Sequence, residues 1–232
     1  MIEPAGAAEL RGLYAALAQR YDSTGWWPAR TRFEMMAGAI LTQRTRWERA
    51  AAAARRLRRA GLLSPARLQQ TSMTGLAALL RPCGDHRTRA RRLLALARFV
   101  TEHGGLNSLA RWSTAALRDA LLEVAGIGPE TADAILLYAF RRPVFVADAY
   151  ALRLFGRSGW LGRVRLPSRY APVHRAVNRI FGDDHRALAA LHAVLVEHGK
   201  ALCRSRPGCA DCFLADRCRT GRRFNRRPAP GR

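Results

Sequence analysis

The sequence is short of acidic residues and almost free of lysine. It has 17 Asp and Glu against 40 Lys and Arg, a net charge of +23, and its single lysine is Lys200. Codon usage can explain arginine in place of lysine, but it does not explain the excess of basic over acidic residues. So large a positive charge predicts a polyanionic partner, most simply a nucleic acid.

Long apolar runs are also missing. No stretch is long enough to cross a bilayer, and Met1–Glu9 lacks the basic segment and apolar core of a secretion signal. We therefore expect a monomeric protein of the cytoplasm or nucleoid, without a membrane partner. Disulfides are unexpected in such a compartment, so the five cysteines need another explanation.

Runs of β-branched residues are short, and apolar residues recur at helical spacing, which predicts an all-α fold. A hydrophobic content of 49% over 232 residues is enough for one compact unit or two small lobes. Val144–Val146 resembles a strand but is too short to seed a sheet. The expected helices are Leu10–Gln19, Arg32–Thr42, Trp47–Ala60, Pro65–Gln70, Thr74–Leu80, Arg87–Glu102, Ala115–Val124 with Thr114 as N-cap, Glu130–Phe140, Tyr150–Gly156, Pro172–Phe181 and His185–His198.

The segment 122–135 has the pattern of two helices joined by a tight turn. Gly126 and Gly128 flank the apolar Ile127, and Pro129 suits the first position of the second helix. The N–H groups of such a turn face outward and form a site for a phosphate. The pattern resembles the helix–hairpin–helix of the endonuclease III superfamily of DNA glycosylases.

This resemblance extends from about Trp26 to Cys218 and implies a two-lobed helical glycosylase fold acting on damaged, double-stranded or distorted DNA. Residues 30–142 would form a helical barrel, residues 1–29 with 143–218 a second lobe, and residues 219–232 a basic, disordered tail. Gly126, Ile127 and Gly128 would bind backbone phosphate. Gln43 would fill the gap that a flipped base leaves.

Asp148 follows the hairpin after the apolar run Val144–Ala147. Breaking a base–sugar bond passes through a transition state with oxocarbenium character, which a nearby carboxylate stabilises. In the resembled family the aspartate downstream of the hairpin is catalytic, and it matches Asp148. A simpler interpretation, an N-cap for the helix at Ala149, is compatible with that role.

Glu130 stands where the bifunctional members of the family carry a lysine that forms a Schiff base with the sugar. A carboxylate cannot form that imine, so the resemblance implies a monofunctional glycosylase. Glu130 is either a second acid–base group or a solvated residue that favours the helix dipole.

Trp26, Trp27 and Trp47 are candidates for an aromatic slot that holds the extruded base, by stacking and by cation–π attraction to an alkylated purine. This arrangement is similar to the 3-methyladenine glycosylase branch. The alternative is that they are ordinary core tryptophans.

Four cysteines, Cys203, Cys209, Cys212 and Cys218, lie within sixteen positions near the C-terminus. Four thiolates in a short loop-rich segment indicate a metal or cluster site. The resembled family carries a structural 4Fe–4S cluster here. Zinc also accepts four thiolates, and free thiols are a further alternative. Cys83 stands apart as a small hydrophobic residue.

An alkylated purine is the first expected substrate, and an oxidised or deaminated pyrimidine is the second. Two alternatives remain. One is a DNA-binding member of the fold without catalysis, which Glu130 and the polar Asp85 and His86 favour, because the family often has an apolar wedge there. The other is a bifunctional enzyme that uses another amine, such as Lys200.

Overall fold

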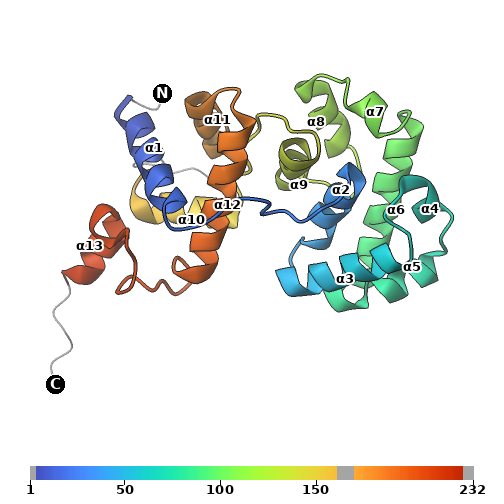
Figure 1. The fold of residues 1–232 in the computed structure, drawn as a ribbon, viewed down its shortest axis with the longest axis horizontal. Helices are drawn as coiled ribbons and strands as arrows, with labels where there is room; N and C mark the ends of the chain where they lie inside the picture. The colour runs from blue at the N-terminus through green and yellow to red at the C-terminus, as the bar shows by residue number, and fades with distance from the viewer. Residues whose placement is uncertain (1–3, 161–169, 227–232) are drawn as a thin grey trace. The chain divides into compact units, whose positions relative to one another are not determined.

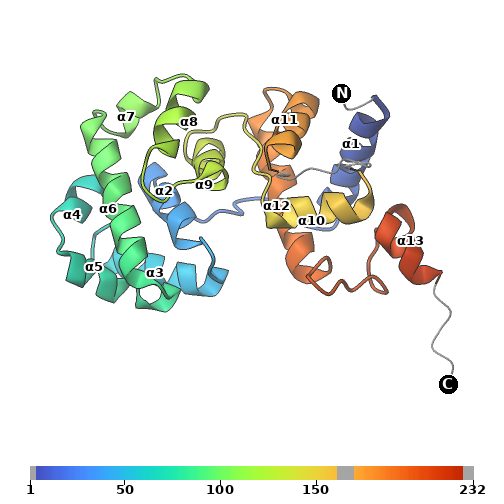
Figure 2. The same ribbon diagram turned by 180° about the vertical axis from the view of Figure 1, so that it is seen from behind.

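The computed structural model describes residues 4–160 and 170–226, and all of its regular elements are helical. They fall into two compact units, which we call the discontinuous unit (residues 1–26 and 143–232) and the contiguous unit (residues 27–142). Both appear in Figures 1 and 2. In the described ranges, no helix is long and apolar enough to span a membrane.

The contiguous unit is built around α2, which packs against α3, α6 and the π-helical turn Ile135–Ala139 (Figure 1). Met36 and Ile40 of α2, Leu93 of α6 and Ile135 are fully buried at the centre. The elements of this unit are α2 (Arg32–Leu41), α3 (Trp47–Arg59), α4 (Pro65–Gln69), α5 (Met73–Leu79), a 3-10 turn (Arg81–Cys83), α6 (His86–Glu102), α7 (Leu106–Leu109), α8 (Thr114–Leu122), α9 (Pro129–Ala134) and the π-helical turn.

The discontinuous unit brings the N-terminal helix against helices from the C-terminal half. Helix α12 packs against both α1 and α10 (Figure 2). Leu10 and Leu17 of α1 and Leu191 and Leu195 of α12 have no exposed surface. The elements are α1 (Pro4–Ala18), α10 (Ala149–Ser158), α11 (Tyr170–Phe181), α12 (His185–Ala201), a 3-10 turn (Ala215–Arg217) and α13 (Arg219–Asn225).

The all-α prediction is confirmed, with three local differences. The tail expected to be disordered from Arg219 begins with helix α13, which is anchored by the buried Gly221, whereas residues 227–232 lie outside the described part. Helix α7 was not expected, because it is a single turn. The N-cap of α8 is Ser113, whose hydroxyl accepts from the N–H of Ala116 at 3.1 Å, and Thr114 is already helical.

Candidate active site, hairpin and cluster loop

Helices α8 and α9 form a helix–hairpin–helix. The turn closes with a hydrogen bond from the Ile127 N–H to the Val124 carbonyl at 2.9 Å. Gly126 has a φ of +88°, and a Cβ there would lie 2.5 Å from the Arg92 side chain. Gly126 is therefore required by the fold of the chain itself. The Ile127 side chain is buried, so a ligand can reach only the backbone of this residue.

Gly128 has a different role from Gly126. Its φ is −97°, which any residue can adopt, and a Cβ at this position would meet no atom within 4 Å. Nothing within the chain requires glycine there. The open backbone of an exposed turn residue is what a close approach by a phosphate would need.

This contrast predicts different outcomes for the same substitution. Gly126→Ala places a side chain in a left-handed conformation and against Arg92, so we expect it to destabilise the protein by about 1–3 kcal/mol. Gly128→Ala is expected to leave the denaturation midpoint unchanged but to weaken DNA binding. Denaturant titration and binding measured at one fixed salt concentration check both results. Unchanged affinity in Gly128→Ala would contradict a phosphate contact at this turn.

The side chain of Gln43 is tied to the hairpin. Its amide nitrogen donates to the Gly126 carbonyl at 2.9 Å and to the Thr131 hydroxyl at 3.0 Å. Arg92 donates to its amide oxygen at 2.5 Å, and the guanidinium of the buried Arg89 donates to its backbone carbonyl. Hydrogen bonds within the contiguous unit therefore hold the Gln43 side chain in place.

A buried ion pair joins the two helices of the hairpin. Arg118 of α8 donates from Nε to Oδ1 of Asp133 at 2.7 Å and from Nη2 to Oδ2 at 3.2 Å. The Asp133 side chain has no exposed surface, whereas that of Arg118 is 28% exposed. The bidentate geometry fixes α9 against α8. Glu130, in the first turn of α9, is exposed.

Asp148 is the N-cap of α10, and it is buried despite its charge. Its Oδ1 accepts from the N–H of Ala151 at 2.8 Å, and its Oδ2 lies 3.6 Å from Nε2 of His192 on α12. The extended segment that leads to Asp148 is anchored to α11. The Phe145 N–H donates to Asn178 at 2.8 Å, and its carbonyl lies 2.7 Å from Nδ1 of His174.

Trp26 belongs to the same unit as Asp148 and contacts α12. Its ring meets the His192 ring edge-on, with centroids 5.4 Å apart, and its Nε1 donates to Glu197 at 2.8 Å. Lys200 donates to the same Glu197 oxygen at 2.9 Å, and its Nζ lies 5.7 Å from the centroid of Trp26. Burial alone would raise the pKa of Glu197, but the bonds from Trp26 and Lys200 outweigh it and lower that pKa.

Trp27 and Trp47 belong to the contiguous unit and pack against each other, with centroids 6.0 Å apart. Tyr138 lies on Trp27 at 5.3 Å, which adds an aromatic residue that the sequence did not single out. Trp27 and Trp47 also line a cavity of about 180 Å³ with residues of α2 and α3, including Glu34 and Arg58. The boundary between the two units falls between Trp26 and Trp27.

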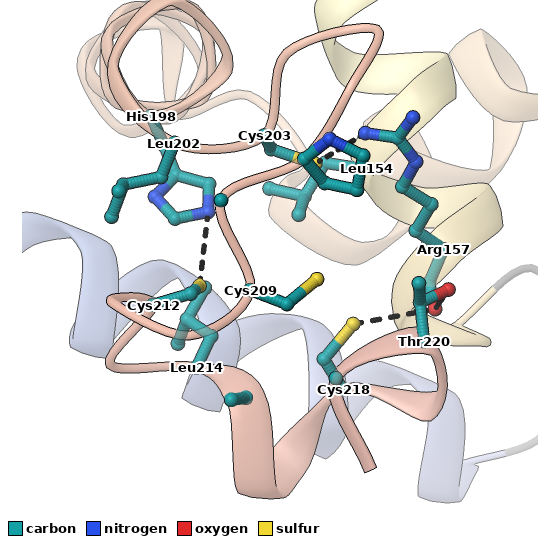
Figure 3. A pocket seen from close by; sticks show the side chains of 14 residues that line it. Leu154, Arg157, His198, Leu202, Cys203, Cys209, Cys212, Leu214, Cys218 and Thr220 are labelled. Carbon is teal, nitrogen blue, oxygen red and sulfur yellow. Dashed lines mark hydrogen bonds between the residues drawn. The ribbon is translucent and has the colours of Figure 1, made fainter. Parts of the chain in front are cut away.

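The four C-terminal cysteines line one pocket, shown in Figure 3. Cys203 follows α12, Cys209 and Cys212 lie in the loop, and Cys218 directly precedes α13. Arg157 donates to the Cys203 sulfur at 3.5 Å, and the Cys218 thiol donates to the Arg157 carbonyl at 3.3 Å. The Cys212 sulfur lies 3.8 Å from the buried His198 ring (Figure 3).

Two of the four thiols have a raised pKa. Burial raises the pKa of the Cys209 thiol, and negative charge on Cys218 and Cys203 raises it further. The pKa of Cys212 is raised first by burial and then by the other three thiols, although the Leu214 N–H opposes this. Four thiolates here would need a cation among them. Across the residues described, no three His, Cys, Asp or Glu groups are placed to hold a single metal ion.

Sequence reasoning singled out Asp148, Trp26, the hairpin and the cysteines but missed several residues that contact them. His192, Glu197 and Asp133 lie within helices and belong to no recognisable motif. Their only sequence signal is an ionisable residue on an otherwise buried helical face. Arg118 gives no signal at all, because it is one of many arginines.

A family model and a relative that match this sequence are both named for DNA repair. The sequence model for the HhH-GPD superfamily of base excision DNA repair proteins matches residues 37–177. A protein of Methanocaldococcus jannaschii assigned as a DNA repair glycosylase is 35% identical over 209 residues, which cover 89% of this chain and 94% of that protein. Endonuclease III of Thermotoga maritima is 27% identical, covering 82% of this chain and 84% of its own.

Solved structures share the fold. An endonuclease III–DNA complex superposes with a TM-score of 0.78 at 20% identity, covering 95% of this chain and 99% of that chain. The H. pylori 3-methyladenine DNA glycosylase bound to 1,N6-ethenoadenine superposes with a TM-score of 0.69 at 24% identity, covering 84% of this chain and 97% of that chain.

Proposed function

Because this chain belongs to the HhH-GPD superfamily of base excision DNA repair proteins, we propose that it is a monofunctional DNA glycosylase with Asp148 as its catalytic carboxylate. The observation that carries the proposal is the buried Asp148 carboxylate, which the α10 cap and the anchored segment 144–147 hold in place. A carboxylate in a water-poor site stabilises the positive charge that develops on the sugar when the base leaves.

An alkylated purine is the proposed first substrate. Trp27 and Trp47 line a cavity of about 180 Å³, and aromatic ring faces attract a cationic base more than a neutral one. An oxidised or deaminated pyrimidine is the second candidate. A base-release assay on oligonucleotides that each carry one lesion separates the two. Tight binding without release of any base would favour the non-catalytic alternative.

The absence of a lysine in the hairpin supports the monofunctional mechanism. Glu130 occupies that position, and the Nζ of Lys200 is engaged by Glu197. Borohydride added during reaction is therefore expected to trap little covalent complex, because the one side-chain amine among the described residues, that of Lys200, is paired with Glu197. Release of the base should produce an abasic strand that stays intact until it is treated with alkali or heat.

A matched pair of variants sharpens this trapping experiment. Lys200→Arg preserves the charge beside Glu197 and removes the primary amine, so it should release base at the wild-type rate. Strong trapping in the wild-type protein that disappears in Lys200→Arg would identify Lys200 as a nucleophile. Strong trapping that persists would identify another amine. Either result would overturn the monofunctional mechanism.

A 4Fe–4S cluster is the proposed cofactor of the cysteine pocket. All four thiols line the same apolar pocket, and the raised pKa values of Cys209 and Cys212 support a site where thiolates need positive charge nearby. Cys203, Cys209, Cys212 and Cys218 would hold the cluster. When bound, it would hold the loop before α13 in place.

This cofactor proposal predicts a brown protein with broad absorbance near ~400 nm and stoichiometric iron. Cys212→Ala should lose both the colour and the iron. Cys83→Ala is the control, since Cys83 is a cysteine of the contiguous unit that lies outside this pocket, and it should retain both. A colourless protein that contains stoichiometric zinc would contradict the iron–sulfur assignment.

A further inference from the structure

The two oxygens of Asp148 have different environments. Oδ1 is engaged by the Ala151 N–H at the start of α10, at 2.8 Å. Oδ2 faces Nε2 of His192 at 3.6 Å, which is slightly longer than a hydrogen bond but within range of an ion pair. The χ2 torsion of an aspartate has a broad energy minimum, so one hydrogen bond at Oδ1 restricts the orientation of the carboxylate only loosely. A second contact at Oδ2 would restrict it further. His192 is the side chain that faces this oxygen.

The His192 ring is itself held in place. Its side chain is only 5% exposed, and Trp26 packs edge-on against it with an interplanar angle of 90°. Trp26 is fixed by its bond to Glu197, which also pairs with Lys200. His192, Glu197 and Lys200 all lie on α12, so one helix orients both the imidazole and the indole that packs on it.

We propose that His192 is a positioning residue that holds Oδ2 of Asp148 in its productive orientation, with Trp26 and Glu197 fixing the imidazole. This inference rests on the proposed glycosylase function. His192 acts through Asp148 and does not contact the substrate. Trp26 accordingly serves the carboxylate by packing on His192, a role distinct from the aromatic cluster around Trp27.

Two substitutions at His192 separate positioning from packing. His192→Leu fills a similar volume but removes the group that faces Oδ2, and we expect its single-turnover base release to be slower by about 10- to 100-fold, as for a misplaced catalytic group. His192→Gln retains a side-chain N–H near the position of Nε2 and should recover most of the rate. Affinity for lesion DNA should be the same in both variants.

His103 provides a matched control. It also meets a tryptophan edge-on, with its ring centroid 5.2 Å from that of Trp112, but it lies in the contiguous unit. His103→Leu should therefore release base at the wild-type rate. If His192→Leu also retains the wild-type rate, or if Gln and Leu at position 192 are equally slow, His192 contributes packing alone and the proposal is overturned.

Ring 15N spectra of the wild-type protein test the contact without relying on activity. The proton should reside on Nε2 of His192, the nitrogen that faces Asp148, and its resonance should shift in Asp148→Asn. A ring protonated only on Nδ1 would contradict the proposal. If the wild-type protein releases no base from any lesion, the proposed function and the catalytic role of Asp148 are overturned. The spectra would still show whether His192 contacts Asp148.

Discussion

Asp148→Asn is expected to lower the single-turnover rate of base release by about 100-fold or more, the typical loss when one preorganised electrostatic group is removed from an active site. Asparagine is as good an N-cap as aspartate, so its amide oxygen can still accept from the Ala151 N–H. The substitution therefore removes the negative charge while α10 keeps its cap. The rate constant should fall without a matching loss of DNA affinity or of stability.

Asp184 offers a control with the same kind of side-chain cap. It is the N-cap of α12, its Oδ1 accepts from the Ala187 N–H at 3.0 Å, and it is exposed. Asp184→Asn should leave base release unchanged. If Asp148→Asn releases base as fast as the wild type on the preferred lesion, Asp148 is only a helix cap, and the proposed mechanism is wrong.

Arg118→Ala is expected to have the largest effect on stability, a loss of about 3–5 kcal/mol in the free energy of unfolding. The substitution removes the guanidinium that bonds both oxygens of Asp133, and Asp133 has no exposed surface. Its carboxylate cannot recover the lost interaction from water without local opening of the hairpin. Urea denaturation measures the change.

Replacing the other partner of the ion pair, and replacing an exposed arginine elsewhere, provide the comparisons for this experiment. Asp133→Ala should cost less than Arg118→Ala, because the 28% exposed Arg118 side chain can be hydrated where it stands. Arg98 on α6 is exposed, and Arg98→Ala should change stability by no more than about 0.5 kcal/mol. Equal, small effects at positions 118 and 133 would show that this ion pair does not hold the hairpin together.

The features that the sequence predicted are those with strong local signals. Helical periodicity gave the all-α fold, and the glycines and proline of 126–129 gave the hairpin, because turn chemistry restricts which residues can occupy it. The position of Asp148 directly before a helical run predicted that it caps α10. Adjacent hydroxyl residues, Ser113 and Thr114, could each cap α8, and only the structure shows that Ser113 does so.

What the sequence could not give are contacts between residues distant along the chain. Trp26 and Trp27 are neighbours, yet their partners lie in different units, His192 for one and Trp47 for the other. The attachment of Gln43 to Gly126 and Thr131 spans more than eighty positions. Such pairings depend on how helices pack, which hydrophobic spacing alone does not specify.

The discontinuous unit also has a consequence for synthesis on the ribosome. Helix α1 emerges first, but its partner α12 follows only after the entire contiguous unit has been made. Domains generally fold as units, with the N-terminal parts first. Residues 27–142 can therefore fold as they emerge. The apolar face of α1, with Leu10 and Leu17, stays uncovered until α12 has been made. A nascent chain that stalls before α12 would expose this face, and release from such a stall would produce an aggregation-prone fragment with a folded contiguous unit.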